Sequence, residues 1–521
     1  MVKMWIVVGE EKGKIKLVSS KEVNAILPKG AFLTIEDEER KHVLMVTDSQ
    51  QFEPYSPSPM LADMNLSPLK QDQKCQNIIH GIRIGDIPER TDGFIDFIRP
   101  QSLARRSSQE EIDSVLGLKN TGPALFLATV HGGKNQILRD EKGNPIKVCF
   151  PTEAFYHQIL ICGKTGSGKT VASKYLAQYF VEEMENFGAV LAVNVKDVDF
   201  LRMDKPSVTN NPDVLNEWKF LGKNASGIKN FVVYYPANSI IPSGNNVNRD
   251  ICRKITLDVM RLDPEALSGL LLGISDTAAQ HLPGIFRKWQ EDNRNAKRRI
   301  TFNDFVQYFA RGEQDKYTYE TMNSRRDILQ VTLPWGTYQN ILRNLEYAIE
   351  FFDNEDAEII DAKDILVRGK MSVINVAGEK GAKFGAVILR HLLKDIVEEK
   401  RMGLSKVPIL ILIDEVHQFY DTNSSKEALG ELDTICRTGR SQEIGVIFSS
   451  QNPSDIPSGL ANVINTKIFF KSDSSAAKLH DISVSSEEIL TLRKGYAIAN
   501  IHGIPQVRVM KFPLAFAGVF E

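Results

Sequence analysis

One run of residues in the first half of the chain has the residue types and spacing of a phosphate-binding loop. It reads Gly163, Lys164, Thr165, Gly166, Ser167, Gly168, Lys169 and Thr170, which is the pattern G-x-x-x-x-G-K-T. Glycines let consecutive backbone N–H groups turn inward around phosphate oxygens. Lys169 would reach the β- and γ-phosphates, and the Thr170 hydroxyl would ligate Mg²⁺. The pattern therefore predicts a site for ATP or GTP.

The residues on either side of this loop predict the strand and helix that such a loop needs. Residues 159–162 form a short apolar run typical of a buried strand, and apolar residues recur at helical spacing over 172–180. The N-terminus of a helix that starts at the loop favours a bound anion. A glycine-rich turn that binds nothing is the alternative, but the spacing and the strand–loop–helix setting favour the nucleotide site.

Two adjacent acids end a second apolar run and could carry the hydrolytic chemistry. Residues 407–413 read as a buried strand, and Asp414 and Glu415 follow at the end where parallel sheets bind their ligands. Asp414 would hold Mg²⁺, directly or through a water, and Glu415 would be the general base for the attacking water. The pair could instead only cap the following helix, but the upstream phosphate loop favours the catalytic interpretation.

A third segment combines a basic turn with the polar end of a strand. Arg437 and Arg440 lie in the turn, and Gln451 follows the apolar strand at 445–449. Gln451 could bond the γ-phosphate or the attacking water, while an arginine of the turn could neutralise charge on a neighbouring subunit's nucleotide. The structural alternatives are a solvated arginine and a glutamine at the edge of the core.

Length and composition indicate the general class of protein to which these candidate residues belong. A chain of 521 residues predicts more than one domain. Its formal net charge of −2 argues against a bulk basic coat for nucleic acid, though a local basic groove stays compatible. The five cysteines are scattered without a CxxC pair, which favours reduced thiols in a cytoplasmic protein over disulfides or zinc. No apolar run approaches the roughly 18 residues that a membrane span needs.

The N-terminal part, residues 1–120, predicts a small β-barrel or sandwich. Short apolar runs bounded by turn residues occur at 5–8, 14–18, 31–35, 42–46 and 82–84. Residues 54–68 read as a loop, and Ser108 begins a capped helix. No catalytic constellation is found in this part, so docking or assembly is the expected role.

The remainder predicts an α/β core with an insertion. Buried strands are expected at 188–195, 231–235, 371–376, 408–413, 445–449 and 464–470, and such apolar strands between helices indicate a parallel sheet. Residues 249–365 read as almost wholly helical, with Trp335 and Tyr338 packed inside, and interrupt the core (121–248 and 366–521). Basic clusters at 294–299 and 325–326 could contact a DNA backbone, but charged helix faces are usually only solvated.

Three segments together carry a family resemblance. The loop GKTGSGKT, the run ILILIDEVHQF and the block GRSQEIGVIFSSQNPSDIP resemble the HerA-type ATPases of the HerA/FtsK superfamily. The resemblance is most specific over about 150–200 and 371–500, and the N-terminal part is similar to the HAS-barrel of that family. The run 495–499 is similar to the family's closing Gly-Glu-Ala strand, with Tyr496 in place of the usual glutamate.

The resemblance implies a RecA-like core and a homo-hexameric ring with ATP and Mg²⁺ at subunit interfaces. By this resemblance, Lys169 and Thr170 belong to the nucleotide loop, Asp414 and Glu415 are the metal and base acids, and Gln451 is the sensor. Arg440 is the expected finger acting in trans, with Arg437 in reserve. One departure is the run Asn194–Phe200, where the family shows an Asp-Pro-His-Gly-Glu-Tyr-like sequence.

The expected activity is ATP hydrolysis that drives translocation along, or unwinding of, double-stranded DNA, together with a partner nuclease or effector. The alternative is an ATP-dependent platform for an anti-phage effector, a nuclease or an NAD-consuming subunit, docked on the N-terminal β-domain. A translocase for single strands or for protein is a third option, which the lack of a membrane segment disfavours.

Overall fold

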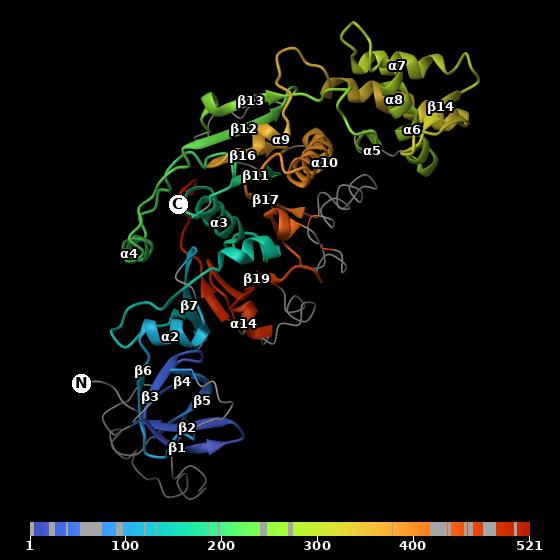
Figure 1. Cartoon of the computed structure of the whole chain (residues 1–521). Coiled ribbons are helices and arrows are strands. Elements are labelled where there is room, and N and C mark those ends of the chain that lie inside the picture. The colour runs from blue at the N-terminus through green and yellow to red at the C-terminus, as the bar shows by residue number, and fades with distance from the viewer. Residues whose placement is uncertain are drawn as a thin grey trace, which may run out of the picture. The chain divides into compact units, whose positions relative to one another are not determined.

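The first strands of the chain close into an antiparallel barrel, as their short apolar runs predicted (Figure 1). Trp5, Leu17 and Ile79 fill its interior, because alternate side chains of each strand point inward. The predicted capped helix follows, and Ser108 and Glu111 form its capping box. The strand order is β1-β2-β5-β4-β3-β6, with β1 (Trp5–Glu11), β2 (Lys14–Ser19), β3 (Phe32–Glu36), β4 (Lys41–Phe52), β5 (Gln76–Ile87) and β6 (Leu103–Arg106), and the helix is α2 (Gln109–Leu116).

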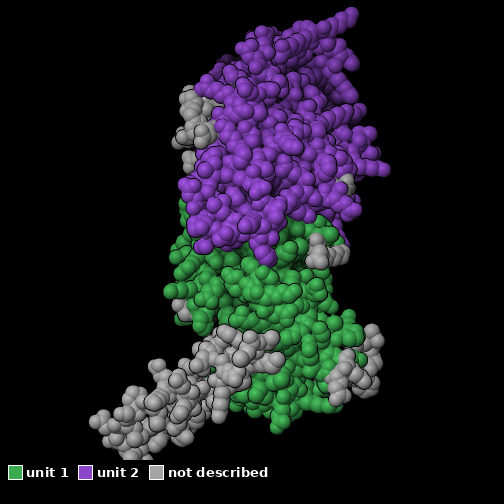
Figure 2. Space-filling view, turned by 90° about the vertical axis from the view of Figure 1, so that its left-hand side faces the viewer, with its two compact units in different colours: residues 1–154, 162–169, 465–513 green, residues 155–161, 170–464, 514–521 purple. Residues whose placement is uncertain are grey.

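The computed structural model divides into two compact units, which Figure 2 distinguishes by colour. Unit 1 comprises residues 1–154, 162–169 and 465–513, and unit 2 comprises residues 155–161, 170–464 and 514–521. The residues that the structure describes are 5–19, 27–37, 40–52, 76–89, 97–118, 121–131, 133–185, 187–195, 198–239, 247–268, 275–377, 379–416, 435, 439–452, 456, 462–472, 486–504 and 508–521.

Unit 1 also contains antiparallel strands from two separate parts of the chain, residues 124–149 and residues 466–511. They follow the order β19-β20-β21-β7-β8, and β9 pairs with β7. The strand predicted at 464–470 forms as β19 and belongs to the same sheet as the parallel strands. Its pairing with β20 is antiparallel, so this sheet is mixed and not wholly parallel as the sequence predicted. The bounds are β7 (Ala124–His131), β8 (Lys134–Ile137), β9 (Lys147–Cys149), β19 (Thr466–Phe470), β20 (Tyr496–Asn500) and β21 (Arg508–Lys511), with the short helix α14 (Ser486–Leu490).

Unit 2 contains the predicted parallel sheet. Its order is β13-β12-β16-β11-β17-β18-β10, and helices α9 and α10 pack on β16. Strands β11, β17 and β18 are buried along their whole length, which explains their continuous apolar sequences. The bounds are β10 (Ile159–Cys162), β11 (Ala189–Asn194), β12 (Asn230–Pro236), β13 (Cys252–Ile255), β16 (Lys370–Asn375), β17 (Ile409–Ile413), β18 (Ile444–Ser450), α3 (Lys169–Glu182), α4 (Pro212–Phe220), α9 (Ala362–Ile365) and α10 (Glu379–Arg401).

One hydrogen bond fixes the direction of β10 in this sheet. The N–H of Val446, near the start of β18, donates to the side-chain oxygen of Gln158, which directly precedes β10, at 2.8 Å. The two strands therefore begin side by side and run the same way. Since β17 and β18 are also parallel, the carboxyl ends of all three strands lie at one edge of the sheet.

Residues 249–365 are less uniformly helical than the sequence predicted. Strand β13 adds to the sheet beside β12, and an antiparallel hairpin of β14 and β15 accompanies the helices. Tyr338 is buried as expected, but the prediction that Trp335 packs inside is wrong, because it is 63% exposed. The bounds are α5 (Pro264–Leu267), α6 (Asp276–Asn293), α7 (Phe302–Arg311), α8 (Trp335–Ala348), β14 (Thr318–Met322) and β15 (Ile328–Thr332).

Three further expectations concern membrane segments, cysteines and loops. None of the helices in the described ranges is long and apolar enough to cross a bilayer. Cys149, Cys162 and Cys252 are not in disulfide bonds, whereas Cys75 and Cys436 lie outside the described residues. The expected loop at 54–68 and the reserve finger Arg437 also lie outside them.

Candidate nucleotide site

The phosphate loop depends on glycines where the chain passes close to its neighbours. A β-carbon on Gly163 would lie 2.7 Å from the β-carbon of Phe470, and one on Gly168 would lie 3.0 Å from the nitrogen of Gly495. Both glycines also have positive φ angles, 156° and 115°. A side chain at Gly163 would force the loop away from β19, and one at Gly168 would force it away from the backbone of Gly495, so the glycine spacing has a direct steric cause.

Backbone hydrogen bonds within unit 1 hold the loop in place. The N–H of Lys164 donates to the carbonyl of Lys471 at 2.8 Å, and the N–H of Gly495 donates to the carbonyl of Ser167 at 2.9 Å. Lys471 follows β19 and Gly495 precedes β20. The antiparallel strands of unit 1 therefore brace the loop from two sides, which the sequence did not reveal.

The side chain of Lys169 is buried and folds over the loop. Its Nζ donates to the carbonyl of Gly163 at 2.6 Å and to that of Lys164 at 3.3 Å. This position encloses the ammonium group within the turn of the loop, where it can meet the phosphates of a nucleotide. Thr170 occupies the second position of α3, whose first N–H groups have no partner within the helix and favour an anion.

The two predicted acids are buried together at the end of β17. The side-chain nitrogen of Gln451, just beyond β18, donates to Oε1 of Glu415 at 2.9 Å. Glu415 has a left-handed backbone with φ 47°, a conformation that costs a non-glycine residue of order 1–3 kcal/mol and that clusters at functional sites. The structure thus brings Asp414, Glu415 and Gln451 to one edge, as the sequence predicted.

The electrostatics at Asp414 favour a cation. Burial raises the pKa of Asp414, the nearby hydroxyl of Ser449 lowers it, and the negative charges of Glu415 and Asp199 raise it again. A buried carboxylate that is next to other carboxylates is stabilised by a divalent ion, and carboxylate and hydroxyl oxygens are the ligands that Mg²⁺ prefers. Asp414 and the hydroxyl of Thr170 therefore fit a Mg²⁺ ion chemically.

Lys174 is a charged residue near this edge that sequence reasoning missed. It is buried one turn into α3, and its Nζ donates to the carbonyl of Gly518 in the C-terminal segment at 2.8 Å. Burial lowers the pKa of Lys174 to about 8, against the opposing charges of Asp199 and Asp414. A lysine on a helix usually extends into solvent, so the sequence carried no signal for this placement.

Asn194, the first residue of the run that departs from the family pattern, has a structural role at the strand ends. Its side-chain nitrogen donates to Oδ1 of Asn375 at 2.7 Å, and its Oδ1 accepts the N–H of Phe200 at 3.2 Å. Because Asn194 and Asn375 end the neighbouring strands β11 and β16, the asparagine ties these strand ends and the following turn together. Lys196 and Asp197 of the same run lie outside the described residues.

Arg440 is not brought to the other candidate residues of its own chain. It is exposed in a short 3-10 turn (Gly439–Gln442) at the amino end of β18, whereas Gln451 follows the carboxyl end. Strand β18 has seven residues, which separate its two ends by about 20 Å. An arginine side chain cannot span that distance, so Arg440 lies out of reach of the acids of the same chain.

Two family models match parts of the chain that contain the candidate site residues. The family model described as "Helicase HerA, central domain" matches residues 136–396, just over half of the chain. The model described as "Helicase HerA-like C-terminal" matches residues 342–470. The first match includes the phosphate loop, and the second includes the acid pair and the strand that leads to Gln451.

Similar individual proteins have been found among curated relatives and solved structures. Proteins named DNA double-strand break repair helicase HerA match at 29% identity over 191 residues in Sulfurisphaera tokodaii (33% of this chain, 38% of that one) and at 28% over 138 residues in Saccharolobus solfataricus (25% and 27%). The matched parts thus span well under half of these relatives. The structure of VirB4 of Thermoanaerobacter pseudethanolicus has a TM-score of 0.46 at 13% identity, over 76% of this chain and 97% of that one. The plasmid coupling protein TrwB in complex with the GTP analogue GDPNP has a TM-score of 0.46 at 14% identity, over 78% and 98%.

Proposed function

The chain belongs to the HerA family of helicase-type P-loop ATPases, and from this premise we propose that it hydrolyses ATP with Mg²⁺ to move along or unwind double-stranded DNA. The observation that carries the proposal is the hydrogen bond between Gln451 and Glu415 beside the buried Asp414. These groups follow parallel strands at the edge where β10 also ends. Because the chain continues from β10 directly into the phosphate loop, ATP hydrolysis at this edge is the function that the arrangement supports best.

Each residue has a distinct role in the proposed reaction. Lys169 and the backbone N–H groups of the loop bind the β- and γ-phosphates and neutralise their charge. A Mg²⁺ ion held by Thr170 and Asp414 would add charge neutralisation at the phosphate oxygens. Glu415 accepts the proton of the attacking water, and Gln451 orients the Glu415 carboxylate through the bond that it donates.

The position of Arg440 favours a site that two subunits share. The side chain is exposed at the opposite edge of the sheet from Glu415, so it can act only on the nucleotide of a neighbouring copy. Where an arginine finger is supplied in trans, it raises turnover by about 10³–10⁵. The proposal therefore includes a ring, a homo-hexamer by family resemblance, in which an isolated subunit is nearly inactive.

Comparing ATP turnover with and without linear duplex DNA tests the proposed substrate. We expect Mg²⁺-dependent turnover that duplex DNA stimulates and that is lost in the matched variant Glu415→Gln. Single-stranded DNA of the same sequence is the control for strand preference. Turnover that duplex DNA does not change would contradict a DNA motor while leaving the ATPase intact.

A second role as an assembly platform has its own supporting observation. Val8 and Leu103 lie on the neighbouring strands β1 and β6 of the barrel and are 50% and 51% exposed. Exposed apolar side chains on adjacent strands suit a partner protein such as a nuclease or an NAD-consuming effector. Capture of that partner by the wild-type protein, lost in Val8→Asp and Leu103→Asp together, is the expected result for this role.

A further inference from the structure

The turn Gly439–Gln442 carries Arg440, the proposed finger, and is too short to fix its own shape. A single 3-10 turn has few internal hydrogen bonds, and their geometry is poor. The N–H of Glu443, directly after the turn, donates to the carbonyl of Arg440 at 3.2 Å. The carbonyl of Glu443 accepts the N–H of Ile409, the first residue of β17, at 3.0 Å. Strand β17 therefore anchors the residue that follows the turn.

Backbone strain indicates that the surrounding structure imposes the conformation of this turn. Glu443 has a left-handed backbone with φ 54°, which a non-glycine residue keeps only where its surroundings hold it. Gly439 is buried, and a β-carbon there would lie 2.9 Å from the carbonyl oxygen of Ile444. The turn thus packs closely against the start of β18 and needs further contacts to stay in place.

Lys400 supplies such a contact from a helix that is distant in the sequence. It lies in the last turn of α10, and its Nζ donates to the carbonyl of Gln442 at 2.7 Å. A lysine on a helix usually extends its ammonium group into solvent, whereas Lys400 is only 9% exposed. Its ammonium group is therefore held at the turn, at the amino end of β18.

The charge of Lys400 strengthens this hydrogen bond. Burial lowers the pKa of Lys400 to about 8, while the charge of Glu443 raises it and the charge of Arg368 lowers it, so most of the amine carries its proton at neutral pH. Hydrogen bonds from a charged donor are roughly twice as strong as those between neutral groups. The bond from Lys400 can therefore offset the strain at Glu443 and hold the turn in one conformation.

We propose that Lys400 is a positioning residue for the finger: through its hydrogen bond to Gln442 it holds the turn in the conformation from which Arg440 reaches the nucleotide of the neighbouring subunit. The inference rests on the proposed function, in which Arg440 acts in trans. The contacts hold the backbone of the turn, while the side chain of Arg440 stays exposed. Lys400 lies at the amino end of β18, so it serves the site of the neighbour and not the site of its own chain.

Steady-state ATP turnover by Lys400→Met protein tests this role. The change keeps the apolar stem of the side chain and removes the donor, so kcat should fall by about tenfold or more, the loss expected for a charge-assisted hydrogen bond. KM for ATP should stay near that of wild type, because the phosphate loop is unchanged. In Arg440→Ala protein the same change should cause no further loss, since Lys400 acts only through Arg440.

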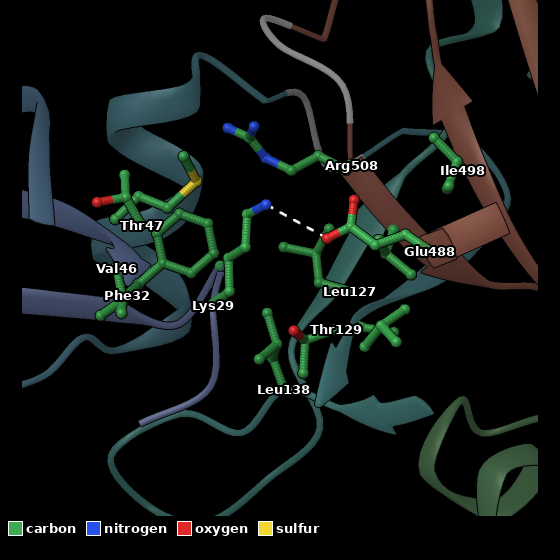
Figure 3. A pocket seen from close by; sticks show the side chains of 15 residues that line it. Lys29, Phe32, Val46, Thr47, Leu127, Thr129, Leu138, Glu488, Ile498 and Arg508 are labelled. Atoms are coloured by element: carbon green, nitrogen blue, oxygen red, sulfur yellow. Dashed lines mark hydrogen bonds and ion pairs between the residues drawn. The ribbon is translucent and has the colours of Figure 1, made fainter. Parts of the chain in front are cut away.

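Mixed rings show which site Lys400 serves. In rings of Lys400→Met and Glu415→Gln chains, some interfaces join an intact Glu415 to a neighbour with an intact Lys400, so turnover should rise above that of either variant alone. A Lys400 that served the site of its own chain would leave every site of these rings defective. Lys29→Met is the control, because this lysine of unit 1 pairs with Glu488 at 3.3 Å (Figure 3) and has no part in the turn, so turnover should not change.

Two further variants keep the inference testable should Lys400→Met fail to fold. Lys400→Gln is uncharged and shorter and should show the same loss of kcat, whereas Lys400→Arg keeps a charged donor and should retain most of the turnover. Wild-type kcat in folded Lys400→Met or Lys400→Gln protein would overturn the inference alone. So would mixed rings that recover turnover with Arg440→Ala and Glu415→Gln chains but not with Lys400→Met in place of Arg440→Ala. Wild-type turnover in Arg440→Ala protein would overturn both the inference and the proposed trans site.

Discussion

The phosphate loop and the acidic end of β17 hold their functional groups by different means. The loop is positioned mainly by its backbone. Its glycines allow close approach to β19, and backbone hydrogen bonds with Lys471 and Gly495 fix its shape. At the end of β17, buried side chains are positioned by other side chains, as Glu415 is by Gln451. We therefore expect changes in the phosphate loop to weaken ATP binding, and changes at the end of β17 to slow ATP hydrolysis.

Lys169→Ala should have the largest effect and should affect binding and turnover together. The change removes the charge that the loop encloses, and the loss of one such group on a transferring phosphoryl costs about 10³-fold or more. Calorimetric titration with ATP and a phosphate-release assay measure the two quantities. Lys219→Ala, at an exposed lysine of α4, is the matched control. Wild-type turnover in the Lys169 variant would contradict the proposed role of the loop in ATP hydrolysis.

Glu415→Gln should separate the two regions. Without a base the attacking water keeps its proton, so turnover should fall by about 10²–10⁴, the usual contribution of general acid–base catalysis. ATP binding should remain near that of wild type, since the loop is unchanged. An equal loss of binding and turnover would show that the acid holds the nucleotide instead of activating water.

Gln451→Ala should reproduce the Glu415 effect in weaker form. The lost hydrogen bond joins an amide to a carboxylate at 2.9 Å, and bonds to charged groups contribute about 1.5–3 kcal/mol. Turnover should therefore fall by about ten- to a hundredfold while ATP binding persists. In the Glu415→Gln background the same change should have much less effect, and full additivity of the two changes would argue against a shared role.

Lys174→Met should affect stability rather than binding, and the effect should depend on pH. The folded pKa of Lys174 is lowered to about 8 from the ordinary value of 10.5. Between these values the unfolded chain holds a proton that the folded protein has released, so wild type gains unfolding free energy as the pH rises. Denaturant titrations at about pH 7 and about pH 10 measure the free energy of unfolding of both proteins. The value for wild type minus the value for the variant should increase between these pH values, by a few kcal/mol at most. A constant difference would contradict the lowered pKa.

The sequence contained the phosphate loop almost completely, because strand, glycines and helix lie within one short stretch. It also contained Asp414, Glu415 and Gln451, since each follows an apolar run that forms a buried strand. Sequence alone could not indicate the hydrogen bond by which Gln451 positions the Glu415 carboxylate. The burial of Lys174 depends on contact with residues 514–521, which are far from α3 in the sequence.

Two strand predictions failed for different reasons, one although the sequence carried a local signal and the other because it carried none. The β14–β15 hairpin, within the block expected to be helical, joins two runs rich in β-branched residues through the turn at Asn323, a signal that was present in the sequence. The antiparallel pairing of β19 with β20 had no such signal. Strand direction depends on the tertiary partner, and an apolar run reads the same in either direction.

The proposal that Arg440 of one chain completes the ATPase site of its neighbour is tested most directly by restoring turnover from two inactive variants. Arg440→Ala lacks the finger and Glu415→Ala lacks the base, so each protein alone should bind ATP with almost no turnover. Co-expressed in one ring, some interfaces would join an intact Glu415 from one chain to an intact Arg440 from its neighbour. The account predicts that turnover returns in these mixed rings. Turnover that stays absent in mixed rings, or wild-type turnover in Arg440→Ala protein by itself, would contradict it.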